Sequence, residues 1–450
     1  MKGAVAVDLG ATSARFAVGL LQDGKIHFQI IKQIPHHAIE RDGKLFWDLP
    51  TLVDLCEEAA EYAAKNYGES TIGIDAWGVD HGFIDSNGRL ILDPVCYRDL
   101  SHKAAFDELE PYREELYRLT GCQHQPFNTI CQLVARRTED PTLPSRSRWL
   151  ILPDLIAFLL TGELNSELTE ASTTQLLGLD DLWSARAFEI AGWPMPKIQP
   201  SLPGKLGAEV KPGIRIAHVG SHDTASAVCG FGGMTKETAF LNVGTWSLLG
   251  TVIDQPTATS AAEQAGFTNE RAVDGRVRFL KNIPGFYVIN RLHEELDVKV
   301  SVPEWLAARE DIETRIDLLD PEFYNPDSML EICTRLADAP PKTEAEWAGL
   351  ALSSLIEAIA RSIVQLEVIA GRTFKKIRVG GGGSQSVDFC QMLADNTSRI
   401  VEAGAAESTV LGNLAVQFLA QGVIADFAAM DQIVADSAEL RLFYPLPTKS

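Results

Sequence analysis

The first hundred residues show two kinds of hydrophobic pattern in turn. Apolar and β-branched runs over residues 3–35 are interrupted at Gly10 and at Asp23-Gly24, which predicts three strands joined by two turns. From Leu49 to Tyr67 apolar positions recur at helical spacing, and the pattern over 70–85 returns to strand, turn and strand. Strands joined by a helix in this way predict an α/β class.

The middle of the chain has a mostly helical pattern. Helical spacing predominates between about residues 100 and 196, and one helix is predicted to begin at Pro153 and end at Thr161-Gly162. The next segment, PSLPGKLGAEVKPGIRIAHVG, is rich in proline and glycine, and we expect it to link two domains. One domain is therefore predicted at 1–216 and a second at 217–450.

The second half of the chain repeats the pattern of the first. AFLNVGTWSLLGTV can be laid on AVAVDLGATSARFAV with Asn242 over Asp8 and Gly244 over Gly10. A long helical stretch over 344–371 leads into KKIRVGGGGSQS, as the earlier helix leads into STIGIDAWG. A repeat of this length predicts two similar domains that face each other across a cleft.

Composition narrows the class of protein. The 450 residues are 46% hydrophobic, enough for more than one core, and 61 acidic against 40 basic residues give a net charge of −21. This charge disfavours nucleic acid and anionic membranes as partners. The seven cysteines lack metal-binding spacing, Asp8 interrupts the apolar start, and no apolar run approaches the ~18 residues of a membrane span. We therefore expect a cytoplasmic protein with free thiols.

The turn in VDLGATSARF is a candidate phosphate site. Backbone N–H groups after Gly10 could surround a phosphate together with the hydroxyls of Thr12 and Ser13. Arg15 would add a cation, and Asp8 could hold a magnesium ion. The alternative is an ordinary hairpin whose turn is capped by Asp8.

Two loops in the second half have a similar character. Thr245 in NVGTWS could donate a hydrogen bond to a phosphate oxygen, although this loop could also be a simple hairpin turn. Four glycines, Gly380 to Gly383, follow an apolar strand and allow a flat ligand or phosphates to approach, unless they form a flexible surface loop. Neither the P-loop nor the dinucleotide-binding pattern is present, which argues against a dinucleotide oxidoreductase.

Two further stretches could serve a polar organic substrate. In SHDTASAV, Asp223 is either the cap of a helix that begins at Thr224 or a base. In IDAWGVDHGFID, Trp77 and His81 could face a sugar beside Gly78, and the alternative for Trp77 is core packing.

Together the motifs resemble the FGGY family of carbohydrate kinases, and within it the rhamnulokinase group. The segments that carry the resemblance extend over nearly the whole chain: VDLGATSARF, GIDAWGVD, PVCYRD, PFNTICQL, EASTTQLLGL, SHDTASAV, NVGTWSLLG, LKNIPGFYVINRL and VGGGGSQS. The resemblance implies two actin-like (ribonuclease H-like) ATPase domains with mixed sheets flanked by helices. It also implies ATP with Mg²⁺, a sugar substrate, and a monomer or homodimer.

The resemblance implies roles for individual residues. Asp223 would be the general base that takes a proton from the sugar's primary hydroxyl. The sugar would be bound by Gly78, His222, Thr224 and Asn282, with Trp77 and His81 beside it. ATP would be bound by Ala11, Thr12, Ser13, Ala14, Arg15, Thr245, Asn290 and Gly382, with Asp8 at the metal. The first domain would thus carry the sugar and phosphate loop, and the second the base and the adenine-nucleotide site.

The implied reaction is transfer of a phosphoryl group from ATP to the 1-hydroxyl of a ketose, with L-rhamnulose favoured. Relative to the family pattern, Ala14 replaces a usual glycine, Asn290 a usual glutamine and His81 a usual aromatic residue. Because His81 would lie beside the sugar, another substrate such as L-fuculose or a ketopentose like xylulose stays open. An actin- or Hsp70-like ATP-binding protein without sugar kinase activity is the alternative from another class.

Overall fold

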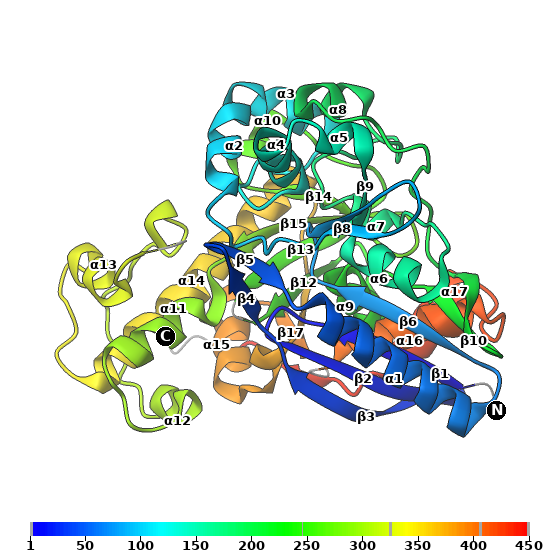
Figure 1. Ribbon diagram of the computed structural model, residues 1–450. Helices are drawn as coiled ribbons and strands as arrows, with labels where there is room; N and C mark the ends of the chain where they lie inside the picture. Colours follow the sequence, from blue (N-terminus) through cyan, green and yellow to red (C-terminus); the bar gives the residue numbers. More distant parts are fainter. Residues whose placement is uncertain (1–2, 245, 324–325, 405–406, 448–450) are drawn as a thin grey trace. The chain divides into compact units, whose positions relative to one another are not determined.

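The computed structural model describes residues 3–447 apart from 245, 324–325 and 405–406. The chain forms two compact units, each built from separate segments (Figure 1). Unit 1 comprises Met1–Gly233, Ile253–Phe279 and Ser408–Ala438, and unit 2 comprises Met234–Val252, Leu280–Glu407 and Glu439–Ser450. The predicted division at residue 216 stays a prediction.

A six-stranded mixed sheet forms the centre of unit 1, with strand order β10-β11-β6-β1-β2-β3. Strands β1 (Gly3–Leu9), β2 (Ser13–Gln22) and β3 (Lys25–Pro35) form the predicted antiparallel meander, and β6 (Ser70–Ala76) lies parallel to β1. Positive φ angles at Asp23 (50°) and Gly24 (74°) make the second turn.

Helices cover both faces of this sheet, which explains why β1 is buried throughout. Side chains alternate along a strand, so Val5 and Val7 pack with α1 (Leu49–Tyr67), whereas Ala4 and Ala6 pack with α16 (Ser408–Ala420). Helix α1 has the predicted bounds because the Asp48 side chain caps its first turn and Gly68, at φ 72°, follows its last.

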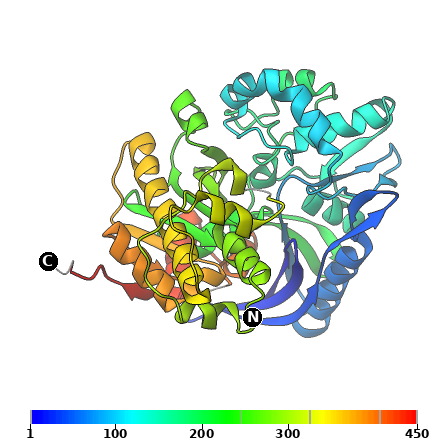
Figure 2. The ribbon, with the colours of Figure 1, turned by 90° about the vertical axis from the view of Figure 1, so that its left-hand side faces the viewer.

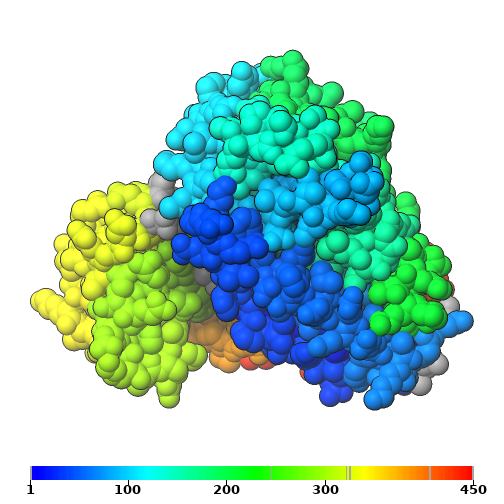
Figure 3. Space-filling view, in the orientation of Figure 1, coloured from blue at the N-terminus to red at the C-terminus, as the bar shows by residue number. Residues whose placement is uncertain are grey.

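The helix-rich middle of the chain forms a second part of unit 1 around the short sheet β8-β7-β9 (Figure 1). Helix α6 begins and ends as its proline and glycine predicted. On the face shown in Figure 3, the first hundred residues (blue) form a continuous surface beside this part (cyan to green). Its elements, with the neighbouring ribbon of β4 and β5, are β4 (Ala38–Arg41), β5 (Lys44–Trp47), β7 (His81–Ile84), β8 (Leu90–Leu92), α2 (His102–Leu109), η1 (Glu110–Tyr112), α3 (Arg113–Thr120), α4 (Thr129–Glu139), α5 (Leu143–Arg146), β9 (Arg148–Ile151), α6 (Leu152–Thr161), α7 (Leu168–Ala171) and α8 (Ala185–Ala191).

The segment expected to link two domains is instead part of the unit 1 sheet. It forms the hairpin β10 (Lys205–Lys211) and β11 (Ile214–His218), and β11 lies parallel to β6. The expectation of a linker was wrong because Pro212-Gly213 makes a hairpin turn, and a turn has the same composition as a linker.

Unit 2 repeats the strand pairing of unit 1. Strand β12 (Thr238–Val243) pairs antiparallel with β13 (Ser247–Ile253) and parallel with β16 (Lys376–Gly380), as β1 does with β2 and β6. Strands β17 (Ile400–Ala403) and β18 (Arg441–Phe443) continue the order β13-β12-β16-β17-β18. The predicted internal repeat is therefore present in the backbone.

The long helix α14 (Glu344–Ala370) begins with the capping box of Thr343 and Glu346 and ends before Gly371. It is the one described helix long and apolar enough to cross a bilayer, but its apolar window is 72% buried inside the protein. Figure 2 shows the neighbouring helices of unit 2 (yellow-green) beside it. The remaining elements are α9 (Asp223–Phe231), α10 (Ser260–Gln264), β14 (Thr268–Arg271), β15 (Val277–Ile283), α11 (Gly285–Glu295), α12 (Val302–Ala307), η2 (Pro321–Phe323), α13 (Met329–Leu336), η3 (Gly382–Gln385), α15 (Val387–Thr397) and α17 (Phe427–Ser437).

Candidate active site

Asp223 is the first residue of α9, and His222, not Asp223, occupies the N-cap position. The Asp223 carboxylate accepts a hydrogen bond from Thr224 Oγ1 at 3.0 Å and lies 3.5 Å from His222 Nε2. Its side chain is 32% exposed, whereas that of His222 is 10% exposed. The helix N-terminus favours the negative charge of Asp223. The residue is thus an accessible carboxylate beside a histidine, and the side-chain cap considered from sequence does not form.

The end of β6 lies next to His222. The Ala76 N–H donates to the Ser221 carbonyl at 2.8 Å, and Ala76 pairs with His222 in a parallel bridge. Gly78 lies two residues further on, and a Cβ there would lie 3.0 Å from the Thr173 side chain, so any larger residue would require Thr173 to shift. Three predicted sugar residues, Gly78, His222 and Thr224, therefore come together in unit 1.

Trp77 packs into an aromatic cluster. It is 6% exposed, its ring centroid lies 4.2 Å from that of Trp47, and its indole N–H donates to Asp80 at 2.8 Å. Burial raises the pKa of Asp80 to about 6, although four hydrogen bonds to this carboxyl oppose the shift. Trp77 is thus packed inside the protein, as the alternative from the sequence describes.

His81 is buried in an aromatic environment. It is 2% exposed, and its ring meets Phe83 and Trp149 edge-on at centroid distances of 5.0 and 5.7 Å. Burial lowers its pKa to about 3, so the ring is neutral. Contact between His81 and a sugar stays a prediction.

The turn after Gly10 is a hairpin turn, which was the alternative to a phosphate site. It still exposes backbone groups. The Gly10 N–H donates to the Ser13 carbonyl at 3.0 Å, and Ser13 Oγ accepts from Gln33 at 2.8 Å. Thr12 is exposed at the tip with Ala11 beside it, while the Ala14 side chain is buried in the core. The loop can therefore offer N–H groups and the Thr12 hydroxyl to an anion.

Acidic groups gather at the strand ends below this turn. Arg15 Nη2 and Nε donate to Asp8 Oδ2 at 2.7 and 3.0 Å, and the strand register places Asp75 beside Asp8. Burial, then Asp8 and Asp223, raise the pKa of Asp75 well above its usual value. No cluster of three or more metal-type side chains occurs in the described part of the chain. Because Mg²⁺ in nucleotide sites uses one or two carboxylates with phosphates and waters, Asp8 fits such an ion.

The predicted nucleotide residues of unit 2 lie on neighbouring elements. The Gly244 carbonyl accepts from the Phe286 N–H at 3.2 Å, which joins the NVGTWS loop to the start of α11, the helix that carries Asn290. In the glycine run, Gly381 has φ 73°, and a Cβ on Gly383 would collide with Val243. A Cβ on Gly382 would meet nothing within 4 Å, so this glycine borders open space. Asn282 lies near the end of β15, and Thr245 lies outside the described residues.

Sequence reasoning missed the charged residues packed around His222. Glu167 accepts from Ser221 N at 3.3 Å and from the N–H groups that begin α7, which fixes the strand end before His222. Burial raises the pKa of Glu167 to about 7. Glu270 and the fully buried Arg278 contact His222 at its Nδ1 atom. A signal was present, since Arg278 interrupts the apolar strand VRFLKNI.

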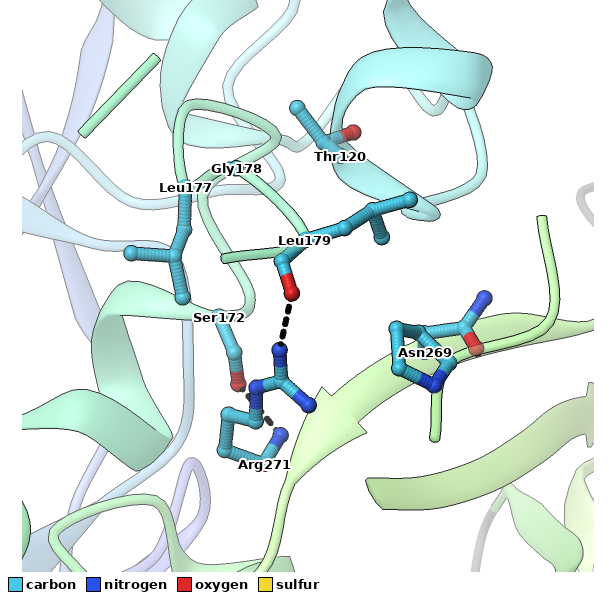
Figure 4. A pocket seen from close by; sticks show the side chains of 8 residues that line it. Thr120, Ser172, Leu177, Gly178, Leu179, Asn269 and Arg271 are labelled. Atoms are coloured by element: carbon cyan, nitrogen blue, oxygen red, sulfur yellow. Dashed lines mark hydrogen bonds between the residues drawn. The ribbon is translucent and has the colours of Figure 1, made fainter. Parts of the chain in front are cut away.

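A small pocket elsewhere in unit 1 does not suit a sugar (Figure 4). It has about 10 Å³ of free volume, the space of about one water molecule. Arg271 reaches across it to donate to the Leu179 carbonyl at 2.8 Å, and Ser172 Oγ accepts from the Arg271 N–H at 2.8 Å. The small space is thus crossed by hydrogen bonds between residues that line it.

Comparisons with known proteins agree with the geometry. Residues 4–218 match the N-terminal domain, and residues 239–421 the C-terminal domain, of the FGGY family of carbohydrate kinases. The chain is 32% identical to rhamnulokinase from Bacillus subtilis (strain 168) over 98% of this chain and 95% of that protein. It is 34% identical to rhamnulokinase from Pectobacterium carotovorum subsp. carotovorum (strain PC1), over 99% and 93%.

Solved structures share the fold at low identity. A ligand-bound xylulose kinase from Lactobacillus acidophilus has a TM-score of 0.84 at 17% identity, covering 99% of this chain and 94% of that one. Plasmodium falciparum glycerol kinase with ADP has a TM-score of 0.79 at 14% identity, with the same coverage. The chain belongs to the FGGY family of carbohydrate kinases and is an ATP-dependent sugar kinase.

Proposed function

We propose that the kinase transfers the γ-phosphoryl group of ATP to the 1-hydroxyl of L-rhamnulose, giving L-rhamnulose 1-phosphate and ADP. The observation that carries the chemistry is the accessible Asp223 carboxylate, 3.5 Å from His222 Nε2 and close to the glycine turn after β6. The relatives named rhamnulokinase support the choice of sugar.

In the proposed reaction Asp223 accepts the proton of the 1-hydroxyl as that oxygen attacks the γ-phosphorus. The bond from phosphorus to the bridging oxygen breaks, and ADP leaves with the electron pair. Phosphoryl transfer mainly requires positioning and charge neutralisation. One carboxylate and loops that donate hydrogen bonds can supply both.

Other residues are proposed to bind the two substrates. Gly78, His222 and Thr224 hold the sugar together with Asn282, while the 11–15 loop, Asn290 and Gly382 bind ATP. Asp8 would hold Mg²⁺, which would neutralise charge on the phosphate oxygens. The location of Asp8 at the strand end beside Arg15 supports this role, because both side chains can then reach phosphate groups bound at the same turn.

Coupled ADP release with ATP, Mg²⁺ and a panel of ketoses tests the proposal. The panel is L-rhamnulose, L-fuculose, L-xylulose and D-xylulose, and we expect kcat/KM to be highest for L-rhamnulose. A higher value for another sugar would replace the substrate and keep the mechanism. ATP turnover that does not depend on sugar would favour the actin- or Hsp70-like alternative.

We also infer a cytoplasmic monomer or homodimer. All seven cysteines are free thiols, in keeping with a reducing compartment. Light scattering on the purified protein would give its mass in solution, and a mass above that of two chains would contradict the inference.

A further inference from the structure

His222 lies between a buried ion pair and the proposed base. Its Nδ1 atom is 3.0 Å from Arg278 Nη2 and 3.4 Å from Glu270 Oε2, and its Nε2 atom is 3.5 Å from Asp223 Oδ1. All four side chains belong to unit 1. The imidazole therefore has distinct partners on its two nitrogen atoms.

The partner at Nδ1 decides which nitrogen carries the proton. A guanidinium group has only N–H donors, so the 3.0 Å contact is favourable only when Nδ1 accepts with its lone pair. A proton on Nδ1 would point at another donor. The contact of Nδ1 with Glu270 Oε2 is longer, at 3.4 Å, and this oxygen lies closer to Arg278 Nη2, at 3.0 Å.

Arg278 cannot easily turn away from this position. Its side chain is fully buried, Nε donates to the Arg271 carbonyl at 2.9 Å, and Nη2 lies 3.0 Å from Glu270 Oε2. Burial alone would raise the pKa of Glu270, but the charge of Arg278 is the largest of the causes that lower it below its usual value, so Glu270 is charged. A buried arginine without such a carboxylate would be strongly unfavourable.

We propose that Arg278 and Glu270 are positioning residues that hold His222 neutral with its proton on Nε2. His222 then donates a hydrogen bond at the reacting hydroxyl or to Asp223, and it has no free lone pair there to accept the substrate's proton. Asp223 remains the base. The role in catalysis rests on the proposed function of Asp223, whereas the tautomer does not.

The neutral form of His222 also keeps Asp223 reactive. An imidazolium next to Asp223 would stabilise the carboxylate and make it a weaker base. Other titratable groups near this site are Glu167, which caps α7, and Glu170 on α7, and both interact with Arg278. An ionised carboxyl at either position would favour positive charge nearby, and the donor at Nδ1 opposes a second proton on His222.

The test uses the full-length protein labelled with ¹⁵N-histidine, with His222→Gln to assign the His222 signals. Two-bond ¹H–¹⁵N spectra from pH 8 to 6 should show a protonated Nε2 and an unprotonated Nδ1 throughout. The double variant Arg278→Met/Glu270→Leu replaces the pair by apolar groups, a change that folded proteins often tolerate. In it, Nδ1 should gain a proton as the pH falls, and kcat/KM for the sugar should drop roughly ten- to hundredfold, the scale of a lost charge-assisted hydrogen bond.

A matched control is available in unit 2. Arg378 and Glu402 form another buried strand pair at 2.7 Å, and Arg378→Met/Glu402→Leu should leave the His222 spectrum unchanged. Arg278→Lys keeps a charged donor and should retain the Nε2–H form, which provides a second variant if the double one does not fold.

The outcomes separate this inference from the proposed function. A proton on Nδ1 in the wild-type protein at pH 8, or an Arg278→Met/Glu270→Leu variant with unchanged spectrum and pH profile, would overturn the inference. Full activity of Asp223→Asn would overturn the proposed function and leave the tautomer result standing.

Discussion

The two units have the same strand pairing, but the residues at the ends of their central strands differ in charge. In unit 1 the parallel pair β1 and β6 brings Asp8 opposite Asp75, with Arg15 on the neighbouring strand. In unit 2 the parallel pair β12 and β16 brings Asn242 opposite Gly380. The repeat is thus one of backbone, and among these paired strand-end positions only those of unit 1 are charged.

Because of this difference, the same backbone arrangement can support proton and cation chemistry in one unit and nucleotide binding in the other. Carboxylates at the end of β1 and at the start of α9 suit proton and cation chemistry. The glycine run after β16 has no side chains in the way of a ligand, and its backbone at Gly381 and Gly383 packs directly on Val243. An uncharged loop of this kind suits the anionic nucleotide, since no carboxylate repels it.

The largest effect should come from Asp223→Asn in unit 1. Loss of the general base should reduce kcat by two orders of magnitude or more and leave ATP affinity nearly unchanged. Coupled ADP release and calorimetric ATP titration measure the two quantities. Asp388→Asn is the control, because Asp388 also lies in the first turn of a helix, α15. Activity of Asp223→Asn near that of the control would show that Asp223 is no base.

Exchange of the strand-end residues between the units tests the comparison directly. Asp8→Asn gives unit 1 the side chain of unit 2, and we expect about a tenfold lower kcat together with a higher Mg²⁺ requirement, because a cation ligand is lost. The reverse change, Asn242→Asp, should raise the KM for ATP by charge repulsion and leave the Mg²⁺ requirement unchanged. Rates measured across a Mg²⁺ titration distinguish the two. Equal Mg²⁺ curves for all three proteins would remove the metal role from Asp8.

The glycine run of unit 2 offers a matched pair of substitutions. Gly383→Ala should lower the free energy of unfolding by about 1–3 kcal/mol, because its Cβ would collide with Val243. Gly382→Ala should leave stability unchanged and raise the KM for ATP a few-fold, since its Cβ would project into open space. Denaturant unfolding and ATP saturation curves test both. A loss of stability in Gly382→Ala would mean that this glycine serves the fold alone.

Local patterns predicted most elements because their signals lie within a few residues. Helix α1 has a capping residue, a helical period and a terminal glycine in one stretch, and the strand-turn-strand repeat also lies within short segments. The hairpin of β10 and β11 was missed because its pairing with β6 involves residues more than a hundred positions away. Composition alone cannot separate such a turn from a linker.

The candidate site was predictable to a similar extent. Motifs indicated Asp223, His222 and Gly78, but the contact of His222 with Arg278 joins residues 56 positions apart, and no pattern encodes it. His81 was expected beside the sugar from its place in the chain, and the structure encloses it between Phe83 and Trp149. His81 lies on β7, which belongs to a different sheet from β6. The alternation of residues along the sequence does not predict which side chains of that second sheet surround it.

The smallest predicted effect concerns the buried carboxyl of Glu170 in unit 1, which has no counterpart among the uncharged strand ends of unit 2. Burial, then Glu167 and Asp223, raise its pKa well above the usual value, and neither carboxyl oxygen has a hydrogen-bond partner in the described structure. The folded protein thus keeps a proton that the unfolded chain releases above about pH 4.3. Stability therefore falls as the pH rises from that value through the folded pKa.

Glu170→Gln cannot ionise in either state, so it should lose this part of the pH dependence. We expect its free energy of unfolding to match the wild type near pH 4.5 and to exceed it increasingly towards pH 8, by about 1.4 kcal/mol for each unit by which the folded pKa exceeds the unfolded pKa. Urea unfolding at several pH values measures the difference. Glu57→Gln, an exposed change on α1, controls for the loss of a carboxyl group. A wild type that gains stability relative to Glu170→Gln as the pH rises would mean that Glu170 is ionised and paired in the folded protein, and the charge contrast between the two units would then extend to α7.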